Sequence, residues 1–468
     1  MLRRRYDIQG IDDVISYKGE IVMEKLVVIG GVAAGLSAAS VAKRLKRSNI
    51  DVMVFEKSGY ISYGACSEPY FVSGLVPRPE DLVEISAQEF EEKRLVHIYK
   101  MHEVIEIDYK GGYVTAIDLS NNKKFTQPFD YLMIATGAKA KALGVPGETL
   151  EGICTLRTVE DAIDVKNSVS SGREVVICGG GYIGLEMAEA FVSLDLNVTI
   201  LKKTPQMLLN FDPEISALVE EEVRSKGVKI ETGIDVLAFE GEGKVEKVVT
   251  NKGEVKADAV LIAKGATPNV DIARQIGIKI GSTGAIAVDE HQRTNIDRVY
   301  AGGDCAEAYH IVLGKPAYIP LGTTANKTGR IAGENIGGLD TKFGGIVGTA
   351  VSKIFDLEVA RTGLSLREAT KNGFDAYATN ISHRSRSKHY PGGCPITVQF
   401  IAERHTKRLL GAQMIGKEGV AHRIDVIAAA LHAGMSADDI YGLDLAYAPP
   451  FAPVWDPILV AANKARKG

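Results

Sequence analysis

Cysteine is scarce in this chain of 468 residues: there are five, an odd number at wide spacings, which excludes a disulfide framework. No apolar run approaches the roughly 18 residues that a membrane-spanning helix needs. The net charge is −4, and no basic stripe with interleaved aromatics marks a nucleic-acid-binding surface. The composition therefore predicts a cytoplasmic globular protein with reduced thiols, with no nucleic-acid or membrane partner and no metal site.

The length favours two or three domains over one. Residues 1–22 begin with basic residues but contain no apolar segment typical of a signal peptide. We interpret them as an appendage before the first strand. Two later segments, 24–45 and 173–191, share one design: an apolar β-branched run, a glycine turn and an alanine-rich helix, followed by a second apolar strand. This order predicts two βαβ dinucleotide-binding units.

The glycines of the two turns carry the evidence for a phosphate site. They let the backbone turn sharply and approach a pyrophosphate, which then lies on the N–H groups that open the helix. One such turn is weak evidence, whereas two in one chain, each between a strand and a helix, are much stronger. The second turn matches GxGxxG in full with Gly179, Gly181 and Gly184, and the first matches with Gly30 and Gly35 but has Val32 in the middle.

Three further apolar strands end in glycine turns, within 129–140, 257–269 and 298–308. The last of them leads into Gly-Gly-Asp, and its Asp304 suits a contact to a ribityl hydroxyl. Such a turn alone suits an ordinary βα loop equally well. In sequence with the other landmarks, we favour a cofactor site.

One cysteine, Cys66 in the stretch SYGACSEPY (62–70), has no second cysteine near it in the sequence. Most free cysteines are small buried hydrophobes, so the surroundings decide whether this one is reactive. The ordered set GGVAAG, Glu56, SYGACSEPY, ATGA, GGGYIG, KGATPN and YAGGD resembles the two-dinucleotide flavoprotein disulfide reductases over about residues 23–468. Within it, SYxxC, YPG, GKEG and AYAPPFAPVWDP are similar to the coenzyme A-disulfide reductase and NADH oxidase branch.

The resemblance implies an α/β fold with two Rossmann-like dinucleotide-binding domains, for FAD and NAD(P)H, and an α/β C-terminal domain that forms a homodimer. The FAD-binding domain would be discontinuous, because the nicotinamide domain is inserted into it. The implied limits are 23–146 and 273–345 for the FAD-binding domain, 147–272 for the NAD(P)-binding domain and 346–468 for the dimerisation domain.

The resemblance also implies the binding residues. Those for FAD are Gly30, Gly31, Ala33, Ala34, Gly35, Glu56, Lys57, Ser62, Cys66, Ala135, Thr136, Gly137, Gly303, Asp304, Thr324 and Ala325. Those for NAD(P)H are Gly179, Gly181, Tyr182, Ile183, Gly184, Glu186, Lys202, Lys203 and Gly265. Those for coenzyme A, whose phosphates need cations, are Ser37, Arg44, Ser62 and Arg94.

In this family the single cysteine lies beside the flavin at a helix N-terminus, and Pro69 supports a helix start here. The positive helix end would lower the pKa of the thiol and favour the nucleophilic thiolate. Cys66 is therefore implied to be the redox-active group, and the second thiol comes from coenzyme A disulfide or a related persulfide or polysulfide. The catalytic groups implied to reach it from the partner subunit, as acids for the leaving thiolate, are Tyr447 with Tyr390 or His389.

Missing residues bear on neighbouring activities. Position 71 is Phe, so the CxxxxC disulfide of dithiol reductases cannot form. Ala33 stands where the oxidases and peroxidases of the family carry a histidine. This weakens the alternative of an NADH oxidase that reduces dioxygen to peroxide or water, and leaves it open. A ferredoxin or rubredoxin reductase, an electron-transfer partner with both glycine turns, is a further alternative that leaves Cys66 unexplained.

The donor preference is predicted from the end of the second strand in each unit. Strands of NAD-preferring units end in an acid that bonds the ribose 2′-hydroxyl. Glu56 fits this pattern in the first unit, whereas Lys202 and Lys203 end the corresponding strand of the second. Lysine attracts a 2′-phosphate that an acid would repel. We therefore expect NADPH to be used at least comparably to NADH, unless both lysines are simply solvated.

Overall fold

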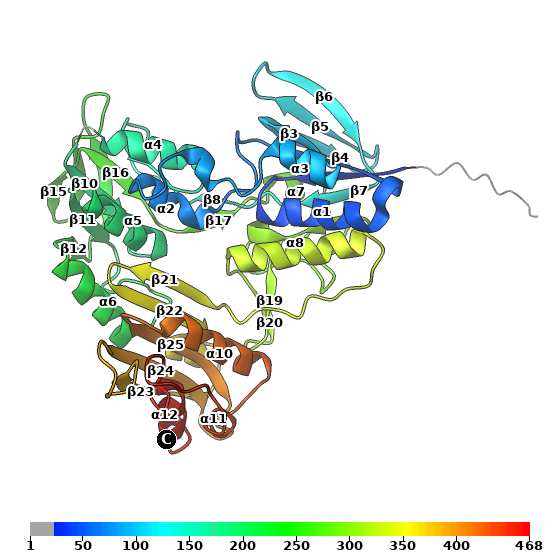
Figure 1. Cartoon of the computed structure of the whole chain (residues 1–468). Coiled ribbons are helices and arrows are strands. Elements are labelled where there is room, and N and C mark those ends of the chain that lie inside the picture. The colour runs from blue at the N-terminus through cyan, green and yellow to red at the C-terminus, as the bar shows by residue number, and fades with distance from the viewer. Residues whose placement is uncertain (1–22, 171) are drawn as a thin grey trace, which may run out of the picture.

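The computed structural model describes residues 23–170 and 172–468, so the predicted appendage at 1–22 lies outside the described residues. The chain forms three lobes, two of them side by side and the C-terminal one below them (Figure 1). Within the two described ranges, no helix has both the length and the apolar composition to cross a membrane.

The first lobe combines the N-terminal part of the chain with a later segment. Its main elements are β1 (Glu24–Ile29), α1 (Ala33–Lys46), β2 (Ile50–Glu56), α3 (Ala87–Arg94), β3 (His97–Lys100), β4 (His102–Asp108), β5 (Tyr113–Asp118), β6 (Lys123–Pro128), β7 (Tyr131–Ile134), β18 (Val299–Ala301) and α8 (Gly322–Ile336). A parallel sheet of order β18-β7-β1-β2-β3 lies at its centre. α1 and α8 pack against each other (Figure 1). Because β18 completes this sheet, the first dinucleotide unit is built from two separate stretches of chain.

The second lobe repeats the design. Its elements are β9 (Ile153–Cys154), α4 (Val159–Val169), β10 (Glu174–Cys178), α5 (Tyr182–Ser193), β11 (Asn197–Lys202), α6 (Pro213–Ser225), β12 (Lys229–Thr232), β13 (Val236–Glu240), β14 (Lys247–Thr250), β15 (Gly253–Lys256) and β16 (Ala259–Ile262). Its parallel sheet has the order β12-β11-β10-β16-β9. The antiparallel pair β8 (Ala138–Ala140) and β17 (Ala266–Pro268) lies where the chain passes between the two lobes.

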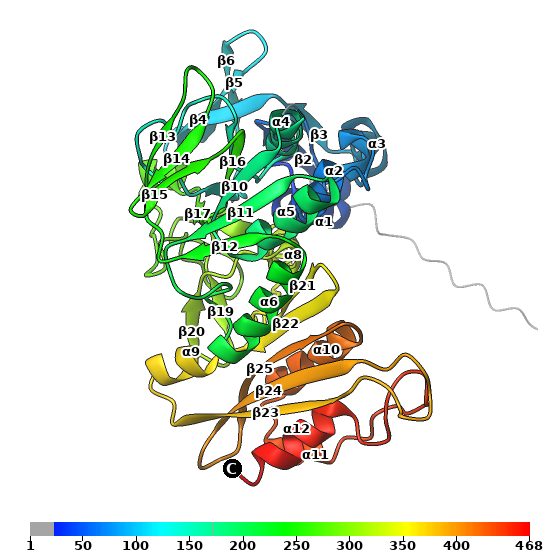
Figure 2. The ribbon, with the colours of Figure 1, turned by 90° about the vertical axis from the view of Figure 1, so that its left-hand side faces the viewer.

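The C-terminal lobe is an antiparallel sheet covered by helices (Figure 2). Its elements are β21 (Ala350–Ile354), β22 (Leu357–Gly363), α9 (Leu366–Lys371), β23 (Ala376–Arg384), β24 (Pro395–Glu403), β25 (Leu409–Gly416), α10 (Val420–His432), α11 (Ala437–Tyr441) and α12 (Pro457–Ala465). α10 and α12 pack on the sheet, whereas Ile354, Val359 and Ile415 join the core of the second lobe. The sheet is therefore attached to the second lobe by buried apolar contacts.

A short helix, α2 (Glu68–Val72), crosses from the first unit to the second lobe. It follows β2 in the sequence, yet it packs against α4 and α5. Phe71 and Val72 are buried in one apolar cluster with Val159 and Leu185 of those helices. This packing fixes the segment that carries Cys66 beside the second glycine turn's helix.

Candidate active site

The first glycine turn joins β1 to α1 through close backbone contacts. Gly30 has φ +110°, and a Cβ there would lie 2.1 Å from the carbonyl oxygen of Ala135. A Cβ on Gly35 would lie 1.8 Å from the carbonyl oxygen of Gly30, so both positions require glycine. Gly31 donates its N–H to Oε2 of the buried Glu56 at 2.7 Å. No described side chain caps the N-terminus of α1, which leaves its N–H groups for a phosphate.

The second turn, between β10 and α5, repeats this geometry. Gly179 has φ +137°, and a Cβ there would lie 2.2 Å from the carbonyl oxygen of Ala263. A Cβ on Gly184 would lie 2.3 Å from the carbonyl oxygen of Gly179. At Gly181, by contrast, a Cβ would meet no described atom within 4 Å. The middle of this turn therefore faces open space, as the close approach of a pyrophosphate requires.

The other residues predicted to bind FAD gather at the carboxyl ends of the parallel strands of the first lobe. Ligands of open α/β sheets bind at this edge. Gly303 has φ +76° and donates its N–H to Thr328 Oγ1 at 2.9 Å. Ala33 and Ala34 open α1, Ala135, Thr136 and Gly137 follow β7, Gly303 and Asp304 follow β18, Thr324 and Ala325 lie in the first turn of α8, and Lys57 is exposed after β2. The residues present fit an extended dinucleotide.

Asp304 forms an ion pair with Arg157, which lies between β9 and α4. The pair joins the two upper lobes, and Asp304 is the more buried partner. Nothing in the sequence pointed to Arg157, because its partner is 147 positions away. The structure thus adds a cation to the group of residues around the predicted flavin site.

Cys66 lies in a 3₁₀ turn, Ala65–Ser67, and α2 begins two residues after it. Part of the Cys66 residue is exposed. The pKa of its thiol is nevertheless raised, chiefly by burial of the sulfur and then by the negative charges of Glu186 and Glu68. Arg157 acts in the opposite direction. The predicted lowering of the thiol pKa is therefore wrong. α2 has only five residues, so its dipole is small, and burial with the nearby carboxylates outweighs it.

The residues predicted to bind the nicotinamide surround the start of α5. Burial raises the pKa of Glu186, whose Oε1 accepts a hydrogen bond from Ser352 Oγ at 2.7 Å. The hydroxyl of Tyr182 accepts one from Asn210 Nδ2 at 3.1 Å. Ile183 is exposed, and Gly265 has φ +94° after β16. Because the charge of Glu186 also raises the pKa of the Cys66 thiol, the two side chains lie near each other.

The two lysines at the end of β11 have different surroundings. Lys203 pairs with Asp235 at 2.7 Å, and its side chain is 71% exposed. Burial lowers the pKa of Lys202. A Cβ on Gly180 would lie 3.5 Å from Cδ of Lys202, which places the Lys202 stem against the glycine turn. The sequence did not predict Asp235, which competes with a 2′-phosphate for the charge of Lys203.

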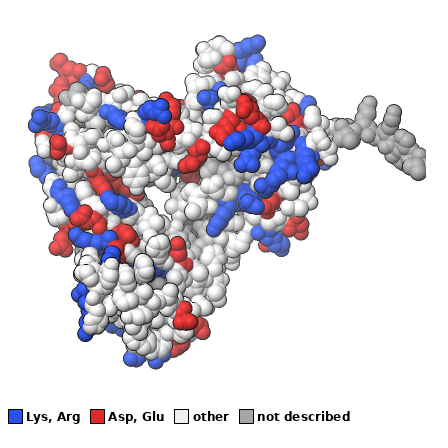
Figure 3. Space-filling view, in the orientation of Figure 1, with Lys and Arg blue, Asp and Glu red and all other residues white. Residues whose placement is uncertain are grey.

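The residues predicted to bind coenzyme A lie on the first lobe. Ser37 Oγ donates a hydrogen bond to Asn326 Oδ1 at 3.0 Å, between α1 and α8. Ser62 has the unusual φ of +49° and donates its N–H to the carbonyl oxygen of Gly31 at 3.1 Å. Arg44 and Arg94 are exposed near the ends of α1 and α3. Figure 3 shows Lys and Arg side chains gathered over this lobe, beside the hollow between the two upper lobes.

The predicted acids lie in loops of the C-terminal lobe, whereas Cys66 lies in the turn before α2. Tyr390 and Tyr447 are 38% and 49% exposed in the C-terminal lobe, and the guanidinium of Arg386 lies 5.9 Å from the Tyr390 ring. His389 precedes Tyr390 in the same loop after β23. In Figure 1 this lobe lies below α2. The three predicted acids and the thiol thus belong to different lobes of one chain.

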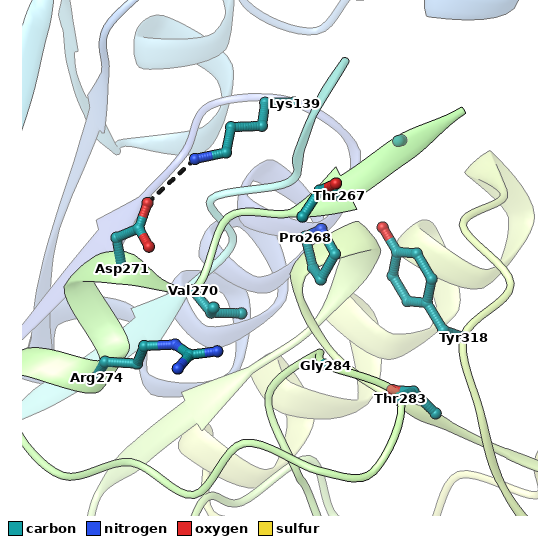
Figure 4. Close-up of a pocket in the computed structure, with 10 residues that line it drawn as sticks. Lys139, Thr267, Pro268, Val270, Asp271, Arg274, Thr283, Gly284 and Tyr318 are labelled. Carbon is teal, nitrogen blue, oxygen red and sulfur yellow. Dashed lines mark hydrogen bonds and ion pairs between the residues drawn. The ribbon is translucent and has the colours of Figure 1, made fainter. Parts of the chain in front are cut away.

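Two pockets lie outside the predicted residues. One, of about 360 Å³, lies beside β8 and β17 and is lined by Lys139, Asp271, Arg274 and Tyr318 among others (Figure 4). Lys139 pairs there with Asp271 at 3.2 Å, and the guanidinium of Arg274 is directed into the space. The other, of about 400 Å³, lies in the C-terminal lobe and includes the exposed Phe451.

With the geometry established, comparisons with known proteins fix the family. The model of the pyridine nucleotide-disulphide oxidoreductases matches residues 24–329, and that of their dimerisation domain matches 349–457. The chain belongs to this family. The predicted fold class is confirmed: two dinucleotide-binding units and an α/β dimerisation domain. Members of the family use FAD and NAD(P)H, so both predicted cofactors are confirmed as well.

Named relatives cover almost the whole chain. An NAD(P)H coenzyme A polysulfide/persulfide reductase from Pyrococcus horikoshii is 42% identical over 448 residues, 95% of this chain and 99% of that protein. An NADH oxidase from Methanocaldococcus jannaschii is 32% identical over 95% of this chain and 99% of its own. The solved structure of an NAD-dependent persulfide reductase from A. fulgidus has a TM-score of 0.91 at 38% identity, covering 95% of this chain and 83% of that one.

Proposed function

We propose that the protein reduces coenzyme A disulfide, or a related coenzyme A persulfide or polysulfide, with NAD(P)H as donor. The observation that carries this proposal is the position of Cys66. Its thiol is within electrostatic reach of Glu186, which follows the second glycine turn, and of Asp304, which lies at the predicted flavin site. A lone thiol between two dinucleotide sites suits the transfer of electrons from a nicotinamide to sulfur. The name of the Pyrococcus horikoshii relative supports the substrate class.

The chain's own residues would divide the work. FAD, when bound, supplies a two-electron carrier between NAD(P)H and sulfur. The two glycine turns would hold the pyrophosphates of the dinucleotides on helix N–H groups. The Cys66 thiolate would attack the substrate disulfide, forming a Cys66–sulfur bond as the substrate's S–S bond breaks and one thiolate leaves. Two electrons from NAD(P)H then convert the mixed disulfide into the Cys66 thiolate and a second thiolate, and Tyr447, with Tyr390 or His389, would protonate the leaving thiolate.

We also propose that the active unit is a homodimer in which Tyr447, with Tyr390 or His389, meets the partner's Cys66. The loop between α11 and α12 supports this, because its apolar side chains are exposed: Phe451 at 78%, Val454 at 64% and Trp455 at 53%. An exposed apolar patch of this kind marks an interaction site. The predicted domain limits, with 273–345 returning to the FAD-binding domain, are supported by the pairing of β18 with β7.

The test is Cys66→Ser in the FAD-loaded enzyme. The variant should keep its flavin and lose NAD(P)H-dependent turnover with coenzyme A disulfide, persulfide and polysulfide. Cys394→Ser is the matched control, because Cys394 is the half-buried free cysteine of the C-terminal lobe. Near wild-type turnover in Cys66→Ser would overturn the assignment.

Dioxygen as acceptor is the second candidate, favoured by the name of the Methanocaldococcus jannaschii relative. Against it stands Ala33 at the start of α1, where no imidazole is available as an acid. Turnover with dioxygen compared with the three sulfur acceptors, in one steady-state series, decides between the candidates. A kcat/KM for dioxygen above all three would favour the oxidase.

A further inference from the structure

Glu68 is a buried acid two positions after Cys66. It opens α2, and only 3% of its surface is exposed. Its Oε1 is buried and has no hydrogen-bond partner among the described residues. A buried carboxylate without donors is costly, so such a group favours its uncharged form.

The groups that face Glu68 from α4 reinforce this effect. Asp161 and Glu160 both act on it as negative charges, and Oε2 of Glu160 is itself buried without a described partner. Arg157, just before α4, is the cation that acts on Glu68. Arg157 already pairs with Asp304, so Glu68 does not have this cation to itself.

Two further cations lie near α2: Lys166 of α4, which contacts Phe71, and Lys353 of β21, which acts on Tyr70. From α4, Lys166 donates to the carbonyl oxygen of Phe71 at 2.9 Å and lies 4.2 Å from its ring centroid. From α5, Glu186 brings a negative charge towards Cys66. Tyr63, on the turn before Cys66, is half-buried, and its desolvation, followed by the charge of Glu68, raises its pKa. The pocket is therefore crowded with acids.

Burial, followed by Asp161, raises the pKa of Glu68 to about 8. The coupling extends to the sulfur, because a charge on Glu68 also raises the pKa of the Cys66 thiol. Two like charges close together oppose each other's formation. A charge on the carboxyl group thus opposes formation of the thiolate.

We propose that Glu68 is a positioning residue for Cys66: its buried, unpartnered carboxyl group leaves room for one negative charge on the sulfur while it holds its proton, and opposes the thiolate once that proton is lost. This inference rests on the proposed role of Cys66 as the reactive thiol. The thiolate therefore forms at higher pH than it would beside an uncharged group, and the carboxyl group causes that delay. Only a proton is exchanged with solvent, and no bond to sulfur changes.

The experiment measures the rate of Cys66 alkylation by iodoacetamide between about pH 6 and pH 10, in the FAD-loaded enzyme, with mass spectrometry locating the modified peptide. Glu68→Gln should match the wild type below about pH 7. Above pH 8 the variant should react faster, by about threefold or more, equivalent to half a pK unit. Glu68→Asp keeps the acid and should restore the wild-type suppression at high pH.

Glu80→Gln is the matched control, because Glu80 is an exposed acid in the 3₁₀ turn Pro79–Leu82 that packs against α2. It removes the same charge near the same helix and should leave the profile unchanged. A rate ratio between Glu68→Gln and wild type that is constant at every pH, or equal to one throughout, would overturn the proposal.

A second measurement uses the wild type alone and does not depend on the folding of Glu68→Gln. The infrared band of an uncharged carboxylic acid should be present at pH 7 and should decline as the pH passes about 8. Absence of that band at pH 7 would also overturn the proposal. Neither readout needs turnover, so loss of the proposed function through Cys66→Ser and loss of this inference can be told apart.

Discussion

Replacing Glu68 by Gln should change how the stability around α2 depends on pH. The pKa of Glu68 is raised from 4.5 in a free side chain to about 8 in the fold. A raised acid pKa means that the carboxyl group's stabilising contribution is complete below about pH 4.5 and is lost as the pH rises through 8. A shift of about 3.5 pK units corresponds to about 5 kcal/mol at 1.36 kcal/mol per unit, which is an upper bound because the structure relaxes around a buried charge.

The glutamine variant lacks this titration, so its local stability relative to the wild type should grow steadily between about pH 5 and pH 8 and then level off. Hydrogen exchange of the α2 amides, followed by mass spectrometry, reports the free energy of local opening and avoids treating a chain of several domains as two-state. Glu80→Gln provides the comparison at an exposed acid of the neighbouring turn. A stability difference that stays flat across this pH range would refute the reasoning, because it would show that Glu68 is ionised as easily as a surface acid.

Tyr447→Phe removes only a hydroxyl, so folding and flavin content should stay unchanged while turnover with the disulfide falls; full activity of a strictly monomeric enzyme would contradict the cross-subunit role. For the donor, kcat/KM should be at least comparable for NADPH and NADH, and Lys202→Glu or Lys203→Glu should shift the ratio towards NADH by about tenfold, or 1.4 kcal/mol. Asp235→Asn should move it the other way, because Lys203 then loses its ion-pair partner. A wild-type preference for NADH above a hundredfold would rule out the lysine argument.

Local patterns made much of this fold predictable. The two glycine turns could be predicted from the sequence because local neighbours within one strand-turn-helix unit make glycine necessary. Gly30 needs a positive φ, and Gly184 lies close to the backbone of Gly179. The thiol at Cys66 stood out because no second cysteine lies near it in the sequence. The roles assigned to the individual site residues remain predictions, as do the domain limits, because the sequence supplied them only through a family resemblance.

What the sequence could not supply depends on contacts between distant segments. The ion pair of Arg157 with Asp304 joins two lobes, and nothing in the sequence near either residue predicts that they pair. The sequence around Glu68 is polar and does not predict that α2 packs against α4 and α5 and that Glu68 becomes buried. The predicted direction of the Cys66 pKa shift was wrong for this reason. Burial of the thiol, followed by nearby carboxylates, chiefly that of Glu186, raises the pKa by more than the short helix α2 lowers it.

The anchoring of α2 limits how freely the parts of this enzyme can be exchanged. Its chain segment belongs to the flavin unit, yet Phe71 and Val72 are part of the apolar core of the other unit. A chimera that received a foreign nicotinamide module would lose the surface on which the reactive cysteine's segment rests. Grafting would succeed only if the donor module carried matching apolar positions on its equivalents of α4 and α5. The segment that carries Cys66 thus belongs in sequence to one module and is held in place by the other.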